Sequence, residues 1–163
     1  MLHLGRRVRW INLPLYSHIM EIKYHKAIPE NRAALESHLL SLSLPVEDLP
    51  ADLANFTLAF DGSVLVGSAG VEPIGTVGLL RSVGVAESHR NLGLAGHLFK
   101  SSIDTARTKG IREIWLITNT ADSYFERHGF ERINRESVPA EIADTPQFKG
   151  LCPSSAVVMR KLL

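Results

Sequence analysis

The fold is decided by residues 79–109, LLRSVGVAESHRNLGLAGHLFKSSIDTARTK. Residues 79–85 alternate with a period of two and include β-branched side chains, which predicts a strand. Residues 86–91 then have the composition of a turn. Apolar side chains next recur at helical spacing, at Leu94, Ala95, Leu98, Phe99, Ile103 and Ala106. The stretch therefore predicts a strand, a short loop and an amphipathic helix over residues 94–109.

The junction between this loop and the helix favours an anion. The first N–H groups of a helix have no internal partner, and the aligned peptide dipoles leave partial positive charge there. Gly93 and Gly96 lack a Cβ, so an anion can approach the backbone closely, and Asn91 tolerates a positive φ. Arg90 adds a positive charge. The alternative is that the two glycines only let the helix pack closely on a sheet, with Arg90 a solvated loop charge.

The run RNLGLA, residues 90–95, resembles the R/Q-x-x-G-x-G/A signature of the GCN5-related N-acetyltransferases, whose loop amides hold the pyrophosphate of acetyl-coenzyme A. The preceding LRSVGV, residues 80–85, is similar to the strand before that signature. The resemblance implies a mixed α/β (α+β) fold with helices on both faces of the sheet. Two central parallel strands, residues 79–85 and 113–118, would splay apart, and the pantetheine arm would lie between them.

The cofactor-binding residues that this resemblance implies lie on the first splayed strand, in the loop, at the helix start and after the second splayed strand. They are Val83, Gly84, Val85, Arg90, Asn91, Leu92, Gly93, Leu94, Ala95, Gly96 and Asn119. Asn119 equally suits a helix cap. A dinucleotide-binding fold is disfavoured because no G-x-G-x-x-G follows the strand.

Composition bounds the protein further. The chain has 163 residues, of which 45% are hydrophobic and 21% charged, as in a globular domain. The formal net charge of +1 gives no reason to expect nucleic acid or a membrane as a partner. A single cysteine, Cys152, excludes an intrachain disulfide and favours a cytoplasmic location. The histidines have no metal-ligand spacing, so no metal is expected, and the oligomeric state, including a homodimer, stays open.

The remaining elements follow from periodicity and turn signals. Residues 1–19 fit neither period, so we interpret them as an N-terminal extension that precedes a single domain of residues 20–163. The predicted strands are 20–25, 56–60, 64–72, 114–117, 130–134 and 156–160, and the predicted helices are 29–42, 46–53, 121–128 and a helical turn at 139–143.

Acetyl transfer to an amine needs a neutral amine, a polarised thioester carbonyl and a proton for the departing sulfur. A backbone N–H at Val83 or a neighbour would polarise the carbonyl. Many family members carry a tyrosine general acid in the pattern F-Y-E-x-x-G-F, whereas residues 124–130 read YFERHGF. Phe125 occupies the usual tyrosine position, and Tyr124 lies about 100° round the helix from it.

Tyr124 is nevertheless our candidate general acid, with simple packing at the helix edge as the alternative. Glu72, near the end of a strand opposite the first splayed strand, is our candidate general base, with a solvated surface carboxylate as the alternative. Among the other ionisable groups, His97, His128 and Cys152 are expected to be structural.

A closer resemblance, to the arsenic-resistance N-acetyltransferases, is carried by LRSV (80–83), VPAEI (138–142) and LCPSSA (151–156). That group is also similar to the acetyltransferase domain of N-acetylglutamate synthases. It implies a small-molecule acceptor with an amino-acid-like amine, an arsenical one included. The side chains that would meet an acceptor carboxylate or merely face water are Arg81, Arg132, Arg135 and Ser154. A coenzyme A-binding sensor without turnover and a protein acetyltransferase are the competing functions.

Overall fold

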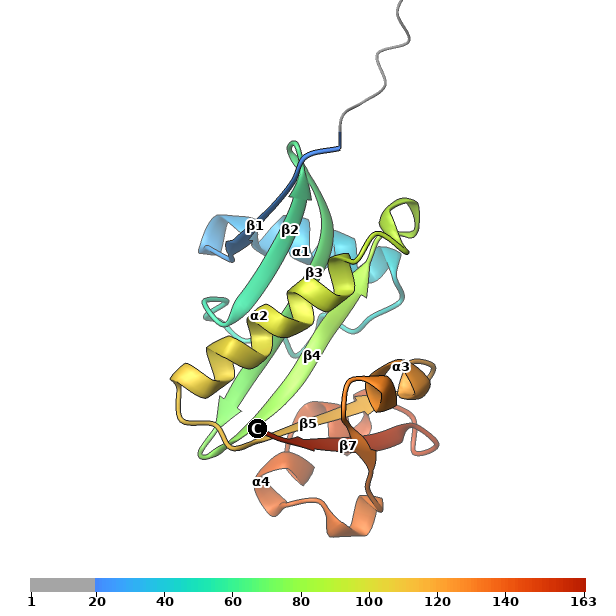
Figure 1. Ribbon diagram of the computed structural model, residues 1–163. Coiled ribbons are helices and arrows are strands. Elements are labelled where there is room, and N and C mark those ends of the chain that lie inside the picture. Colours follow the sequence, from blue (N-terminus) through green and yellow to red (C-terminus); the bar gives the residue numbers. More distant parts are fainter. Residues whose placement is uncertain (1–19) are drawn as a thin grey trace, which may run out of the picture.

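The structure, a computed structural model, describes residues 20–163 (Figure 1). The predicted extension, residues 1–19, lies outside this range. A seven-stranded mixed sheet has the order β1-β2-β3-β4-β5-β7-β6. The strands are β1 (Ile22–Lys26), β2 (Phe56–Asp61), β3 (Val64–Ile74), β4 (Val77–Val85), β5 (Glu113–Thr118), β6 (Glu131–Arg132) and β7 (Val157–Leu162). The α-helices are α1 (Arg32–Ser41), α2 (Leu94–Thr108), α3 (Asp122–Arg127) and α4 (Ala140–Ala143).

Helices cover both faces of the sheet, as predicted. Alternate residues of β2 point to opposite sides: Phe56 packs with Leu35 of α1, whereas Ala59 packs with Leu98 of α2. Figure 1 accordingly shows α2 crossing in front of the long strands and α1 behind them. Because the side chains of a strand point alternately to the two faces of the sheet, one strand can contribute to the apolar core on both faces.

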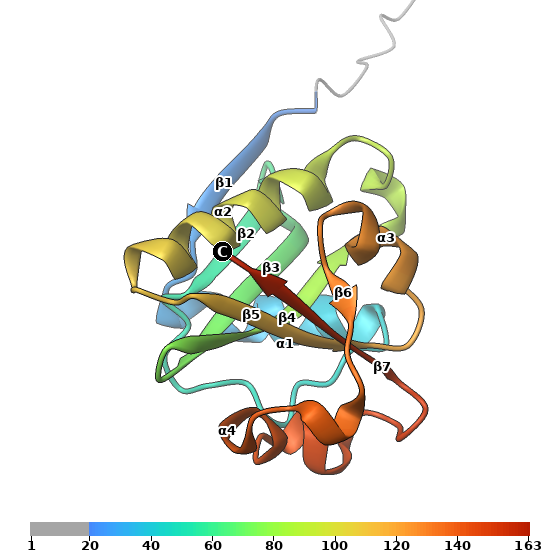
Figure 2. The ribbon, with the colours of Figure 1, turned by 60° about the horizontal axis from the view of Figure 1, so that its bottom comes forward.

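The C-terminal third of the described chain repeats this two-sided arrangement on β5. Ile114 and Leu116 pack in the core that includes Phe99 of α2, while Trp115 packs on the other face with Ile142 of α4 and Phe148. Figure 2 shows α4 and the turns that follow it on the face of the sheet opposite α2. The tail after β6 therefore builds one wall of the molecule before it returns as β7.

The two central parallel strands separate. β4 and β5 pair only between Val77–Leu79 and Glu113–Trp115, although β4 continues to Val85. The β3–β4 register shifts between Ser68 and Gly70, and Ser82 on the facing strand adopts a left-handed φ of 55°. A bulge of this kind sharpens the local twist of a strand, so β4 turns away from β5. The predicted splaying of strands 79–85 and 113–118 is confirmed.

The predicted helix at residues 46–53 is wrong. These residues form turns and extended chain, flanked and interrupted by Pro45 and Pro50, which remove helical N–H donors. The backbone carbonyl of Asp48 instead accepts a hydrogen bond of 3.0 Å from Nη1 of Arg81. Apolar side chains of this loop still pack beside α1. The spacing of apolar residues in 46–53 therefore indicated buried contacts and not a helix.

A buried ion pair holds this loop on the sheet. The side chain of Arg81 is 1% exposed and that of Asp48 is 5% exposed. Nη1 of Arg81 donates to Oδ2 of Asp48 at 2.8 Å and to Oε2 of Glu72 at 3.1 Å, while Nη2 donates to Oδ1 of Asp48. Removing one partner of a buried pair leaves charge that neither water nor protein compensates.

We therefore expect Asp48→Ala to lower the free energy of unfolding by about 3 kcal/mol, measured by urea denaturation. The matched control is Asp144→Ala, since Asp144 pairs with Lys149 at an exposed site. The Asp144→Ala substitution should lower the free energy of unfolding by less than about 1 kcal/mol. Equal losses in the two variants would show that the Asp48–Arg81 pair does not hold the loop.

Candidate active site

A cleft of about 640 Å³ opens where β4 and β5 diverge. Its wall is built from segments that are far apart in the sequence. They are residues 42–45 after α1, residues 80–85 of β4, Arg90, Ala95, residues 116–121, Tyr124 and Phe125 of α3, and Gln147, Leu151 and Cys152 of the tail.

At one end of the cleft lies the N-terminus of α2. Gly93 has a left-handed φ of 82° and directly precedes the helix, and Asn91 has a φ of 62°. A Cβ built on Gly93 or Gly96 would meet no atom within 4 Å. The alternative in which these glycines serve close helix-to-sheet packing is therefore wrong. The backbone here faces open space, as an anion-binding helix terminus requires.

The predicted cofactor residues fall into two groups. Six of them border the cleft, namely Val83, Gly84, Val85, Arg90, Ala95 and Asn119. The other five, Asn91, Leu92, Gly93, Leu94 and Gly96, do not border it and form the loop and the first turn of α2. The side chain of Leu94 is buried in the core, so a contribution from this position is limited to its backbone N–H.

Gly84 joins β4 to the helical layer behind it. Nε2 of His38, on α1, donates to the carbonyl oxygen of Gly84 at 3.3 Å, and burial lowers the pKa of His38. A Cβ at residue 84 would lie 2.5 Å from Cδ1 of Leu42. The absent side chain therefore lets the end of α1 close against the strand and form one wall of the cleft.

The hydroxyl of Tyr124 is the most informative polar group in the cleft. It is buried, and no described residue offers it a hydrogen-bond partner. The ring stacks on His128 with centroids 4.3 Å apart, and burial raises the pKa of Tyr124. Phe125, at the usual tyrosine position, packs in the core against Phe130. The tyrosine is thus displaced by one residue but still borders the cleft.

Glu72 does not border the cleft, and its carboxylate pairs with Arg81 as described above. This placement ties its charge to Arg81 and leaves Glu72 reachable from the cleft only through intervening groups.

The four side chains predicted to meet an acceptor carboxylate differ in the partners that they already have within the protein. Arg81 has two acidic partners, and Arg132 pairs on the surface with Asp122 and Glu126. Arg135 donates to the carbonyls of Phe148 and Pro153, has no acidic partner among residues 20–163, and keeps a buried Nε without a partner. Ser154 is exposed.

Sequence reasoning missed two parts of the cleft wall. The loop at residues 42–45 gave no signal beyond its turn-forming residues, and Gln147 was not singled out at all. Cys152 was expected to be buried and inert. It is half-buried at the cleft, and burial, followed by the charge of Asp48, raises the pKa of its thiol.

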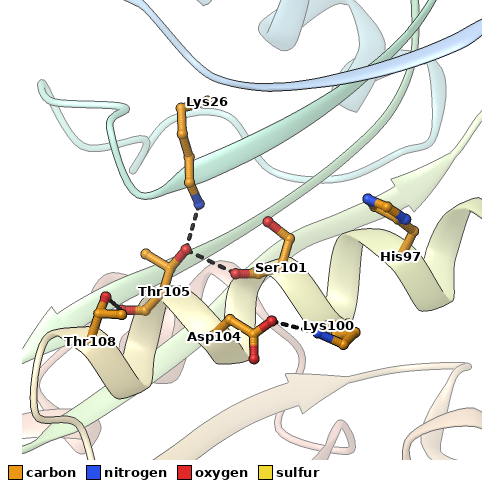
Figure 3. Close-up of a pocket in the computed structure, with 7 residues that line it drawn as sticks. All are labelled: Lys26, His97, Lys100, Ser101, Asp104, Thr105 and Thr108. Atoms are coloured by element: carbon orange, nitrogen blue, oxygen red, sulfur yellow. Dashed lines mark hydrogen bonds and ion pairs between the residues drawn. The ribbon is translucent and has the colours of Figure 1, made fainter.

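A second depression of about 400 Å³ lies between α2 and Lys26 of β1 (Figure 3). Nζ of Lys26 donates to the hydroxyl of Thr105, which lines the depression, and to that of Thr57 beside it, which also bonds Ser101. Within the described range, no group of three or more His, Cys, Asp or Glu side chains is placed to hold a metal, and no helix is long and apolar enough to span a membrane.

Residues 17–130 match the model of the acetyltransferase (GNAT) family. The chain belongs to this family. A search of curated protein sequences gives no match. The cleft between the splayed strands is accordingly the candidate site for acetyl transfer.

Solved structures agree with this fold. N-acetylglutamate synthase from Neisseria gonorrhoeae, complexed with coenzyme A and L-arginine, aligns with a TM-score of 0.73 and 15% identity, over 87% of this chain and 33% of that one. The present chain thus spans about a third of the length of that enzyme. A GNAT acetyltransferase from Staphylococcus aureus Mu50 aligns at 0.73 and 20% identity, over 88% and 99% of the two chains. PaiA N-acetyltransferase from Thermoplasma acidophilum, in complex with coenzyme A, aligns at 0.62 and 17% identity, over 88% and 100%.

Proposed function

We propose that this GNAT acetyltransferase moves the acetyl group of acetyl-coenzyme A to the amine of a small amino-acid-like molecule, by direct transfer in a ternary complex. The observation that carries the proposal is the continuity of the cleft. It runs past Arg90 and Ala95 at the start of α2, along the unpaired edge of β4, to a buried tyrosine hydroxyl and the tail.

The cofactor end fits coenzyme A. Backbone N–H groups at residues 93–96 and the guanidinium of Arg90 would hold the pyrophosphate, because a helix N-terminus and a cation both attract anions. The pantetheine arm would lie along residues 83–85, beside Asn119. Two of the similar structures, the Neisseria and Thermoplasma enzymes, were solved with coenzyme A, which supports coenzyme A as the ligand of this site.

The chemistry then needs three groups. An N–H of β4 at Val83 or a neighbour would polarise the thioester carbonyl while the amine nitrogen attacks its carbon. As the carbon–sulfur bond breaks, the sulfur would take a proton from Tyr124, whose raised pKa keeps the phenol protonated. Because Glu72 is bound to Arg81 away from the cleft, it would remove the ammonium proton through a chain of waters.

Arg135 supports an acceptor that carries a carboxylate. Of the three candidate arginines it is the one without an acidic partner among the described residues, and its charge affects Cys152 at the cleft. A carboxylate beside the acceptor amine would supply that partner. A similar structure, of the Neisseria N-acetylglutamate synthase, was solved with N-acetyl-glutamate, which is consistent with an amino-acid acceptor. The same prediction includes an arsenical amino acid as the acceptor.

The test is a calorimetric titration of the protein with acetyl-coenzyme A, followed by a thiol-release assay over amino acids, arsenical amines and peptides. Binding together with release on amino-acid-like amines is the expected result. Binding without release on any acceptor would instead support a coenzyme A-binding sensor, which Phe125 at the usual tyrosine position keeps in consideration. Release on peptides alone would support a protein acetyltransferase. Three further points remain predictions: a cytoplasmic location, the domain limits 20–163 and a homodimer.

We expect Gly93→Asp to weaken acetyl-coenzyme A binding at least tenfold, since like charges about 4 Å apart near a protein surface repel by several kcal/mol. Gly62→Asp is the matched control, because Gly62 also has a left-handed φ, of 59°, and lies in the β2–β3 turn with open space around it. Calorimetry on both variants separates the effects. Equal affinities for the two would refute the placement of the pyrophosphate at the start of α2.

We expect Tyr124→Phe to lower kcat about 100-fold with little loss of stability, because the hydroxyl has no hydrogen bond to lose. A general acid acts in its protonated form and is lost as pH rises through its pKa. Since burial raises the pKa of Tyr124, kcat of the parent protein should fall only above about pH 10. Tyr24→Phe, on β1 beside His97, is the control and should keep the parent profile. An unchanged kcat in Tyr124→Phe would remove this residue from the mechanism.

A further inference from the structure

Gln147 is a buried residue that borders the cleft. The residue is 5% exposed, and its side chain makes no hydrogen bond with any of residues 20–163. Its amide nitrogen and oxygen are not enclosed by the protein, unlike the hydroxyl of Tyr124, so they face the open space of the cleft. A polar group left in this state at the wall of a cleft is therefore placed for a ligand that enters the cleft.

The local backbone fixes the position of Gln147. The residue begins a π-helical turn, Gln147–Leu151, and its carbonyl accepts from the N–H of Cys152 at 3.1 Å. The next residue, Phe148, is buried against Trp115 and Ile142, and its carbonyl accepts from Arg135. Gln147 therefore lies on a well-anchored turn and not on a loose tail.

This turn borders the acceptor end of the cleft. It lies on the face of the sheet opposite α2, together with α4, as Figure 2 shows. Leu151 and Cys152 from the same segment line the cleft with Gln147, as does the loop after α1. Arg90 and the start of α2, which suit the phosphates, belong to the other end. The partner of Gln147 is accordingly the acceptor and not the nucleotide.

The charges near this turn disfavour a second anion as that partner. Arg81 is already matched by two carboxylates, those of Asp48 and Glu72. Arg135, which donates to the carbonyl of Phe148 in this turn, is the cation that the proposed function assigns to the carboxylate beside the acceptor amine. A second carboxylate placed beside Gln147 would find neither arginine unmatched and would face the amide oxygen as well.

We infer that Gln147 recognises, by hydrogen bonds, a neutral carboxamide in the side chain of the acceptor. A glutamine amide has one N–H₂ donor and one carbonyl acceptor. A primary carboxamide has the same two groups, so the two amides can pair by two hydrogen bonds, whereas a carboxylate accepts only. The inference rests on the proposed function and narrows its acceptors to amino acids with a carboxamide side chain.

The experiment compares thiol release from acetyl-coenzyme A with L-glutamine, its isosteric carboxylate L-glutamate, and apolar L-leucine. The parent protein should have its highest kcat/KM on L-glutamine. Gln147→Leu should lower kcat/KM on L-glutamine by about tenfold or more and leave L-leucine within a few-fold, because only the carboxamide loses partners. The KM for acetyl-coenzyme A should not change.

Two further variants serve as a matched control and as a second substitution of Gln147. Asn55→Leu makes the same amide-to-leucine change at a residue that does not border the cleft, and should keep the parent preference. Gln147→Glu preserves size and removes the donor, so it should also lose the preference for L-glutamine, and it replaces Gln147→Leu if that variant does not fold. A parent preference for L-glutamate, or an identical preference in the parent and Gln147→Leu, would overturn the inference while leaving acetyl transfer intact.

Failure of the proposed function gives a different result. If acetyl-coenzyme A binds and no acceptor releases thiol, the titration is repeated with L-glutamine against the protein saturated with coenzyme A. Binding of L-glutamine that is lost in Gln147→Leu would support the role of Gln147 in a protein that does not turn over. Absent binding, or binding equal in the two proteins, would overturn it.

Discussion

The separation of β4 from β5 is the constraint on which the rest of the structure depends. The two parallel strands share three register pairs and then diverge, so the remaining length of β4 has no β5 neighbour on that side. Backbone polar groups at such an edge need partners, from water or from a bound molecule. The bulge at Ser82 is the local cause of the divergence, because it turns the strand without breaking its pairing with β3. A cleft in the middle of a sheet is the result.

The groups around this cleft arrive from both faces of the sheet. The start of α2 reaches one end, and the tail after α4 reaches the other, with Tyr124 of α3 on the wall. This division places the helix terminus and the amide of Gln147 on separate segments of the cleft wall, so in the proposed function one cleft would hold a charged cofactor and a separately recognised acceptor. The displaced tyrosine fits the same proposal, since its buried hydroxyl lacks a partner among residues 20–163 and its raised pKa would preserve the proton that a departing sulfur needs.

The buried charges of Arg81, Asp48 and Glu72 link stability to the site. Arg81 holds the loop after α1 against β4, and this loop borders the cleft through residues 42–45. A buried arginine is tolerated only with well-matched partners, which explains why two carboxylates surround it. The same pairing removes Arg81 as a free cation for the acceptor. In the proposed function, Arg135 is therefore left to bind the acceptor carboxylate.

The sequence by itself determined what depends on neighbouring residues. The period-two strand, the glycines before α2 and the helical stripe from Leu94 are all local signals, and each lies where it was predicted. The tertiary structure alone decided what depends on distant partners. Residues 46–53 have helical spacing, but Asp48 bonds Arg81, and the register of α3 brings both Tyr124 and Phe125 to the cleft wall, with Phe125 also packed in the core. Gln147 had no signal at all, since a glutamine becomes informative only when the fold places its amide at the wall of a cleft without a hydrogen-bond partner among the described residues.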